Sequence, residues 1–206
     1  MVYDKLVILD LSGTLIHKYD YNRNATKPKS TLIYNKEFYQ LIHLKNGRKI
    51  TPCYGLVDFI ESLMSKYRVA IWSSTTDYNT NPIIKSIFPK HIIERFLFIW
   101  HREFTELDPD YGKEDYEHIQ KYDTIKPIDN IKASPIINYS RKWDRHNMII
   151  IDDSPDKLRF NPPENNIVVP TYMLSEFDEK QTVIDLEYLN YLEELIDDRF
   201  ELLTQN

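Results

Sequence analysis

The chain has 206 residues, with 26 lysines and arginines against 32 aspartates and glutamates, so its formal net charge is −6. This length predicts one domain with an insertion or a tail. The acidic balance argues against nucleic acid as a partner, because domains that bind it non-specifically are strongly basic. Hydrophobic residues make up 42% of the chain, which is enough to build a sizeable core.

The single cysteine and the short apolar runs indicate the cellular compartment in which the protein is expected. Cys53 is the only cysteine, so no internal disulfide and no cysteine-ligated zinc site can form, and a lone cysteine of this kind is usually buried. The first apolar run, residues 6–11, is interrupted by Asp10 and is too short for a signal peptide or a membrane span. We therefore expect a soluble, intracellular protein of the cytoplasm or nucleus without a membrane partner. The sequence leaves the oligomeric state open.

Short apolar runs alternate with helical patterns along the chain. Continuous apolar runs of this length are typical of strands that are covered on both faces. The predicted strands are residues 6–9, 69–72, 96–100, 148–151 and 167–169. The predicted helices are residues 55–66, 80–88 and 182–203. This alternation predicts an α/β fold with a parallel sheet.

Two polar stretches, residues 17–53 and 101–135, interrupt the alternation. Both are too long for plain connections, so we interpret them as small insertions over the sheet edge, with hairpins as one form for them. The segment Asp108-Pro109-Asp110 predicts a turn in the second stretch. Ligands bind beyond the carboxyl ends of strands in such folds, so the insertions are expected to contact substrate.

Polar residues follow two of the predicted strands in patterns that are typical of phosphate chemistry. Asp10 ends the first strand and is followed by Ser12 and Gly13. A carboxylate there can act as a nucleophile toward phosphorus, and the turn amides can cradle a phosphate; an ordinary turn is the alternative. Ser73 and Ser74 follow the strand at 69–72. They can donate to a phosphate, cap the next helix, or do both.

Asp152 and Asp153 follow the strand at 148–151. Together with Asp10 they offer the hard oxygen ligands that Mg²⁺ prefers, whereas the alternative is a turn with a helix N-cap. Three acids at neighbouring strand ends would repel one another without a cation. A lysine is also expected at such a site, and the candidates are Lys126, Lys132 and Lys142.

Taken together, these motifs resemble the haloacid-dehalogenase superfamily, and within it the small C-terminal-domain phosphatases and NLI-interacting-factor-like (NIF) proteins. The resemblance rests on Asp10-Leu11-Ser12-Gly13-Thr14-Leu15, Pro52 to Leu63, Val69 to Ser74, Ile151 to Pro155, and Asn161-Pro162-Pro163. It covers about residues 4–172. It implies one Rossmannoid α/β domain over residues 1–206, with a parallel central sheet, small insertions and a closing helix at 182–203.

The resemblance also implies a role for each matched residue. Asp10 matches the nucleophile, Thr14 supports its loop, and Ser73 donates to the phosphate, with Ser74 and Lys126 as further substrate-binding residues. The Mg²⁺ ligands are Asp10, Asp153, Asp152 and the carbonyl of Ser12; Asp153 is the preferred ligand of the acidic pair, and Asp152 the preferred partner of the lysine. Lys132 is the first choice for the catalytic lysine, Lys126 the second and Lys142 the third.

Ser12 departs from the family pattern, because the second aspartate, the general acid/base, stands at this position in the family. The expected function is a Mg²⁺-dependent phosphatase that forms an aspartyl-phosphate and acts on phosphoserine or phosphothreonine proteins. Because general acid–base catalysis is worth about 10²–10⁴-fold, Ser12 also favours an alternative, a weak or inactive pseudophosphatase that serves as a binding module. A nucleotide or polynucleotide phosphatase is the third hypothesis, which the acidic charge argues against.

Overall fold

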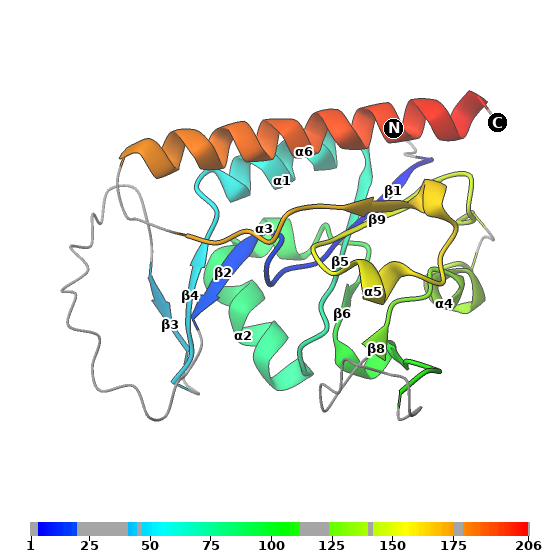
Figure 1. Cartoon of the computed structure of the whole chain (residues 1–206), viewed down its shortest axis with the longest axis horizontal. Coiled ribbons are helices and arrows are strands. Elements are labelled where there is room, and N and C mark those ends of the chain that lie inside the picture. Colours follow the sequence, from blue (N-terminus) through cyan, green and yellow to red (C-terminus); the bar gives the residue numbers. More distant parts are fainter. Residues whose placement is uncertain are drawn as a thin grey trace.

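A five-stranded parallel sheet lies at the centre of the computed structural model (Figure 1). The structure describes residues 4–19, 41–44, 47–111, 124–139, 142–174 and 179–205. The strand order is β10-β9-β1-β5-β6. The strands are β1 (Leu6–Leu9), β5 (Arg68–Trp72), β6 (Ile99–Trp100), β9 (Met148–Asp152) and β10 (Asn166–Val168). This confirms the parallel α/β fold that the sequence predicted.

Both faces of the sheet are buried at its centre, because β1 is apolar at every position and β5 and β9 are apolar except for Arg68 and Asp152 at their ends. Successive strand residues point to opposite faces. Val7 and Leu9 of β1 accordingly belong to one hydrophobic cluster, and Leu6 and Ile8 to a second one. All four side chains have 0% exposure. A one-residue slip would exchange the side chains of the two clusters, so the register of β1 with β5 and β9 fixes which residues stand together at the strand ends.

The helices divide between these two clusters. Residues of α1 (Leu56–Lys66), α2 (Asp77–Ile87), α3 (Lys90–Ile93) and α6 (Glu179–Gln205) contribute to the cluster of Val7 and Leu9. Residues of α4 (Asp129–Ala133) and α5 (Pro155–Leu158) contribute to the other. Helix α6 lies along α1 (Figure 1), where the Ser62 hydroxyl donates to Glu193 at 2.8 Å. No described helix is long and apolar enough to cross a membrane.

The two stretches that break the alternation contain small antiparallel sheets. Strands β2 (Ile16–Tyr19), β3 (Ile42–His43) and β4 (Lys49–Pro52) form one in the order β2-β4-β3, and β7 (Glu106–Leu107) pairs with β8 (Thr124–Ile125) in the other. Short 3₁₀ helices lie at Arg102–Phe104 and Pro163–Asn165. Residues 20–40, 45–46 and 112–123 of the predicted insertions lie outside the described residues. The predicted turn is present, since the amide of Asp110 donates to the Asp108 carboxylate at 2.8 Å.

Element ends differ from the prediction by a few residues. Strand β6 is shorter than residues 96–100, whereas α2 begins at Asp77 instead of residue 80 and α6 extends beyond 182–203 at both ends. Element ends are the least certain part of a sequence prediction, because terminal residues have fewer hydrogen bonds to define them. Cys53 is buried at 2% exposure, as expected, and burial raises the pKa of its thiol.

Candidate active site

Three carboxylates meet at the carboxyl ends of the adjacent strands β1 and β9. The strands are parallel, with Leu9 paired to Ile151, so Asp10 and Asp152 follow at the same level. Asp153 is the next residue along the chain. Asp10, Asp152 and Asp153 each offer an oxygen, and these three oxygens lie within 4.8 Å of one another. The structure thus brings together the three acids that the sequence selected.

Lys126 lies between two of these carboxylates. Its side chain is fully buried, and Nζ donates to Asp10 Oδ1 at 2.6 Å and to Asp152 Oδ2 at 2.5 Å. Its backbone is fixed as well: the amide donates to the Lys157 carbonyl at 2.8 Å, and the carbonyl accepts from Asn161 Nδ2 at 3.0 Å. Asn161, noted in the sequence only as part of a family motif, therefore anchors the lysine segment.

This geometry corrects the order in which the sequence ranked the lysines. Lys132, the first choice, is exposed on α4, and Lys142 pairs with Asp4 at 3.0 Å. Lys126 directly follows β8 and lies between the buried residues Ile125 and Ile128. Those apolar neighbours are the signal that favours a buried lysine, and the sequence reasoning did not use it.

Burial and charge together set the ionisation of the cluster. Burial lowers the pKa of Lys126, but the carboxylates of Asp10 and Asp152 outweigh burial, so that pKa is raised. Burial raises the pKa of Asp10 to about 6, although Lys126 opposes the shift. Burial also raises the pKa of Asp152, but the charges of Lys126 and then Lys157 outweigh burial, so this pKa is lowered. Lys126 is thus a cation and Asp152 an anion near neutral pH.

The residues present fit a divalent cation. When ionised, three carboxylates around one buried lysine leave an excess of negative charge. Asp10 Oδ2 is buried and has no hydrogen-bond partner within the described part of the chain. A Cβ at Gly13, where φ is +89°, would lie 2.2 Å from Asp153 Oδ2, so only glycine lets that carboxylate approach the loop. Carboxylate oxygens are the ligands that Mg²⁺ prefers.

The loop after β1 borders a pocket of about 400 Å³. Its lining includes Ser12 and Gly13 of this loop, Asp153 after β9 and Tyr172 after β10. Residues 17–19 of β2 close another side, so the first predicted insertion does border the site. Ser12 Oγ is buried and lacks a hydrogen-bond partner among the described residues.

Ser73 lies at the end of β5, the other neighbour of β1. Its side chain is 1% exposed, and its amide donates to the Trp100 carbonyl at 2.9 Å. Its hydroxyl shares a 3.0 Å hydrogen bond with Thr75 Oγ1. The N-cap of α2 is Thr76, so neither Ser73 nor Ser74 caps that helix. Ser74 Oγ is buried without a partner among the residues described.

Thr14 completes the loop that follows Asp10. It is fully buried, and its carbonyl accepts a hydrogen bond from the hydroxyl of Tyr188 at 2.9 Å. This contact joins the loop to α6, which is more than 160 residues away in the chain. The sequence resemblance implied support by Thr14, but gave no sign of this partner.

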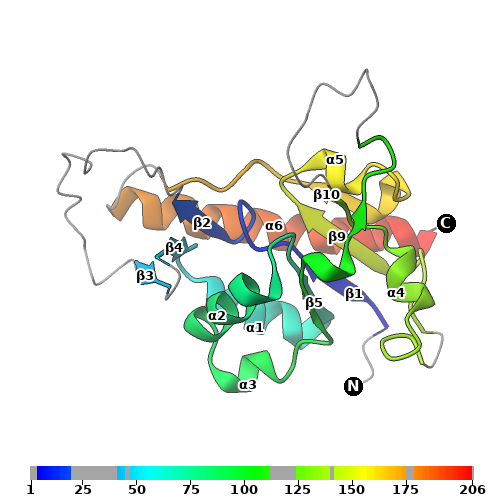
Figure 2. The same ribbon diagram turned by 90° about the horizontal axis from the view of Figure 1, so that it is seen from below.

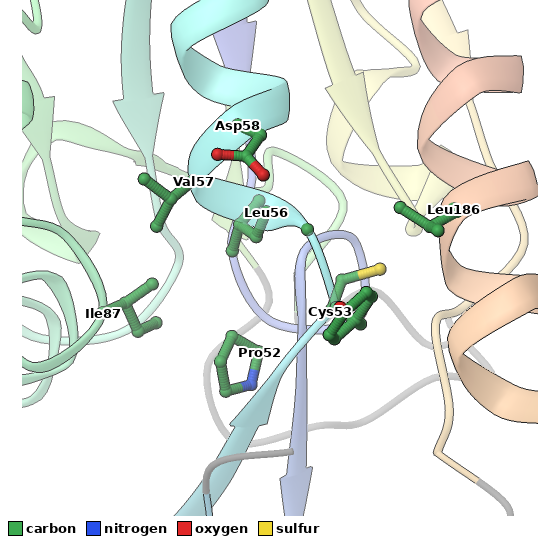
Figure 3. A pocket seen from close by; sticks show the side chains of 9 residues that line it. Pro52, Cys53, Leu56, Val57, Asp58, Ile87 and Leu186 are labelled. Carbon is green, nitrogen blue, oxygen red and sulfur yellow. The ribbon is translucent and has the colours of Figure 1, made fainter. Parts of the chain in front are cut away.

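A second hollow, of about 540 Å³, lies between the start of α1, α2 and α6 (Figure 3). Its lining includes Pro52, Leu56, Val57, Ile87 and Leu186, and among the described residues its only acidic or basic side chain is Asp58. No described lysine, arginine or histidine lines it to bind a phosphate. We therefore assign the candidate active site to the carboxylate cluster.

Comparison with known proteins identifies the family. A model of the family described as NLI interacting factor-like phosphatase matches residues 5–200. The chain belongs to this family. Membership confirms the resemblance carried by the motifs and supports phosphatase activity, because the family is one of phosphatases.

The individual proteins that match this chain share between 16% and 26% of its residues. An uncharacterized FCP1 homology domain-containing protein of Schizosaccharomyces pombe is 26% identical over 195 residues, which are 93% of this chain and 71% of that protein. Two solved structures of the RNA polymerase II CTD phosphatase Fcp1, one from fission yeast with bound beryllium fluoride, are each 16% identical. Their TM-scores are 0.49 and 0.46. Each match covers 95% of this chain, which spans about half of those proteins, 52% and 50%.

Proposed function

We propose that this chain is a metal-dependent phosphomonoester hydrolase that uses Asp10 as its nucleophile. The observation that carries the proposal is the carboxylate of Asp10 at the end of β1. Its Oδ1 accepts from the buried Lys126, and its Oδ2 has no donor in the described part of the chain. An aspartate at the end of a central strand can attack phosphorus and form an acyl phosphate. Membership in a phosphatase family supports hydrolysis of a phosphate ester.

The reaction has two displacements at phosphorus. An oxygen of Asp10 forms a bond to phosphorus while the ester P–O bond breaks, and the leaving oxygen takes the bonding pair. Water then attacks the same phosphorus, which returns the Asp10 carboxylate and releases inorganic phosphate. Lys126 offsets negative charge that develops on the phosphoryl oxygens, and the Ser73 hydroxyl donates to one of them.

A divalent cation fits the site beside these groups. Asp10, Asp153, Asp152 and the carbonyl of Ser12 would hold it, and Mg²⁺ is the ion that this oxygen set favours. When bound, it supplies positive charge beside the transferring phosphoryl group. Asp152 has a second task, since it orients Lys126 through their 2.5 Å contact.

The substrate class that we propose is a phosphoserine or phosphothreonine protein, as the family resemblance implies. The leaving alkoxide of such a substrate needs a proton, and Ser12 occupies the position of the usual acid. A hydroxyl is a poor acid near neutral pH. We therefore expect slow turnover of alkyl phosphates and faster turnover of aryl phosphates, whose leaving groups depart without protonation.

An aryl phosphate assay tests the proposal. Wild type should hydrolyse the ester with Mg²⁺ and lose activity in EDTA. Asp10→Asn should lower the rate at least about a thousandfold, because an amide is a poor nucleophile. The matched control is Asp156→Asn, the same change at an exposed position of α5, which should keep wild-type activity. Asp10→Asn turnover within a few-fold of wild type would exclude Asp10 as the nucleophile. A phosphopeptide panel then defines the substrate.

Ser12 supports a second candidate, a binding module that retains the phosphate site and does not turn over. Here the phosphorylated partner would stay bound at Lys126 and Ser73. Stable binding of a phosphopeptide by wild type, with no release of phosphate in Mg²⁺, would favour this candidate over the enzyme. A nucleotide substrate is tested in the same assay by replacing the peptide with a nucleoside monophosphate.

A further inference from the structure

Helix α6 and the segment after β10 contact the loop after β1 at two consecutive residues. The Tyr188 hydroxyl donates to the Thr14 carbonyl at 2.9 Å. The neighbouring Gly13 carbonyl accepts from the amide of Tyr172 at 2.5 Å. The Tyr172 ring stacks on that of Tyr188, with centroids 5.9 Å apart and planes inclined by 18°. The two carbonyls that follow Ser12 in the loop are therefore both held by one tyrosine pair.

Asp185, which also lies on α6, binds the Tyr172 member of this pair. Its side chain is fully buried, and Oδ2 accepts from the Tyr172 hydroxyl at 2.8 Å and from the Tyr54 amide at 2.8 Å. Oδ1 accepts from Gln181 Nε2 at 2.8 Å. A buried carboxylate is costly unless donors satisfy it. Because Gln181 lies on α6 itself, the hydrogen bonds from Tyr172 and Tyr54 are the two that tie α6 to neighbouring segments.

Helix α6 also approaches the start of α1 closely at Gly55. Leu186 faces the turn between β4 and α1 (Figure 3), and a Cβ added to Gly55 would lie 2.9 Å from its Cδ2. Seen from below, α6 passes behind the end of β1 and the start of β2 (Figure 2). The helix thus closes against both the turn at Gly55 and the loop at Thr14.

We propose that Tyr188 and Asp185 are positioning residues, through which α6 holds the Ser12–Thr14 loop in the geometry that the chemistry at Asp10 requires. The proposal rests on the proposed function. The loop carries the Ser12 carbonyl, a predicted cation ligand, and Gly13, against which the Asp153 carboxylate packs. A small displacement of a positioned group can cost a large factor in rate, even where the change lies outside the pocket.

Tyr188→Phe tests the proposal, because it removes one hydroxyl and keeps the ring that stacks on Tyr172. The matched control is Tyr191→Phe, on the same helix but 51% exposed. Amide hydrogen exchange measures the loop directly, and kinetics with an aryl phosphate measure its effect. We expect exchange of the residue 12–16 amides to rise roughly tenfold in Tyr188→Phe, because the Thr14 carbonyl loses its partner. The control should match wild type.

The kinetic result separates positioning from general stability. We expect kcat of Tyr188→Phe to fall about tenfold with KM within twofold, and with exchange in β5 and β9 unchanged. Asp185→Asn, which disturbs the donors to that carboxylate, should show the same pattern more strongly. Loop exchange equal to wild type in Tyr188→Phe, or faster exchange spread over the whole sheet, would overturn the proposal. If wild type has no turnover, the proposed function fails, and the exchange data alone decide whether α6 holds the loop.

Discussion

Replacement of Lys126 by methionine is the sharpest test of the electrostatics of the site. Methionine has a side chain of similar length but no charge, so Lys126→Met removes the buried cation and keeps most of the packing. Nζ lies 2.6 Å from Asp10 and 2.5 Å from Asp152, and the exposed fractions of the three side chains are between 0% and 2%. The substitution therefore leaves buried carboxylates without their compensating charge.

The size of the effect follows from the burial. Removal of one partner from a buried ion pair costs about 3–5 kcal/mol. For a chain of this length, 1 kcal/mol corresponds to roughly 2–4 °C in the melting temperature. We therefore expect Lys126→Met to melt about 6–20 °C below wild type at pH 8. The matched control is Lys132→Met on the exposed face of α4, which should change the melting temperature by less than about 2 °C.

The loss of stability in Lys126→Met should depend on pH. Burial raises the pKa of Asp10 to about 6 while Lys126 opposes the shift, so without Lys126 this pKa lies higher still. A carboxyl whose pKa is raised by folding favours the folded state when protonated, and that stability is lost as the pH rises through the folded pKa. At pH 5 Asp10 of the variant can be protonated, so the variant should recover part of the stability that it loses at pH 8.

Thermal denaturation at pH 5 and pH 8, each referred to wild type at the same pH, measures the effect. The melting temperature of Lys126→Met should lie further below that of wild type at pH 8 than at pH 5. An equal deficit at both pH values, or one below about 2 °C at pH 8, would refute the reasoning, because Lys126 would then not compensate buried carboxylates.

Three further predictions concern the cation and the missing acid. Asp153→Ala should abolish the rise in melting temperature that Mg²⁺ produces in wild type; an unchanged rise would show that Asp153 is no ligand. Gly13→Ala should destabilise the fold more than Gly47→Ala, since both have positive φ but only Gly13 faces Asp153; equal melting temperatures would contradict this contact. Ser12→Asp should raise kcat/KM more for phosphoserine peptides than for an aryl phosphate, up to about 10²–10⁴-fold; no rise in a folded variant would favour the binding module.

The sequence determined the parts of this protein that depend on local pattern. Apolar runs predicted the central strands, because a strand covered on both faces must be apolar throughout. Residues that follow such runs lie at one edge of a parallel sheet, which is why Asp10, Ser73 and Asp152 could be selected as neighbours. The family motifs then gave these strand ends a chemical meaning, including the departure at Ser12.

Tertiary structure decided which residues from outside those strands reach the site. No local pattern states that β9 lies beside β1, or that the segment after β8 passes over their ends, so Lys132 ranked above Lys126. Likewise, amphipathic spacing predicted a closing helix near residues 182–203, but it could not place the Tyr188 hydroxyl 2.9 Å from the Thr14 carbonyl. Periodicity reports which face of an element is buried. The partner across that buried face depends on how distant segments pack, and this information exists only in the folded chain.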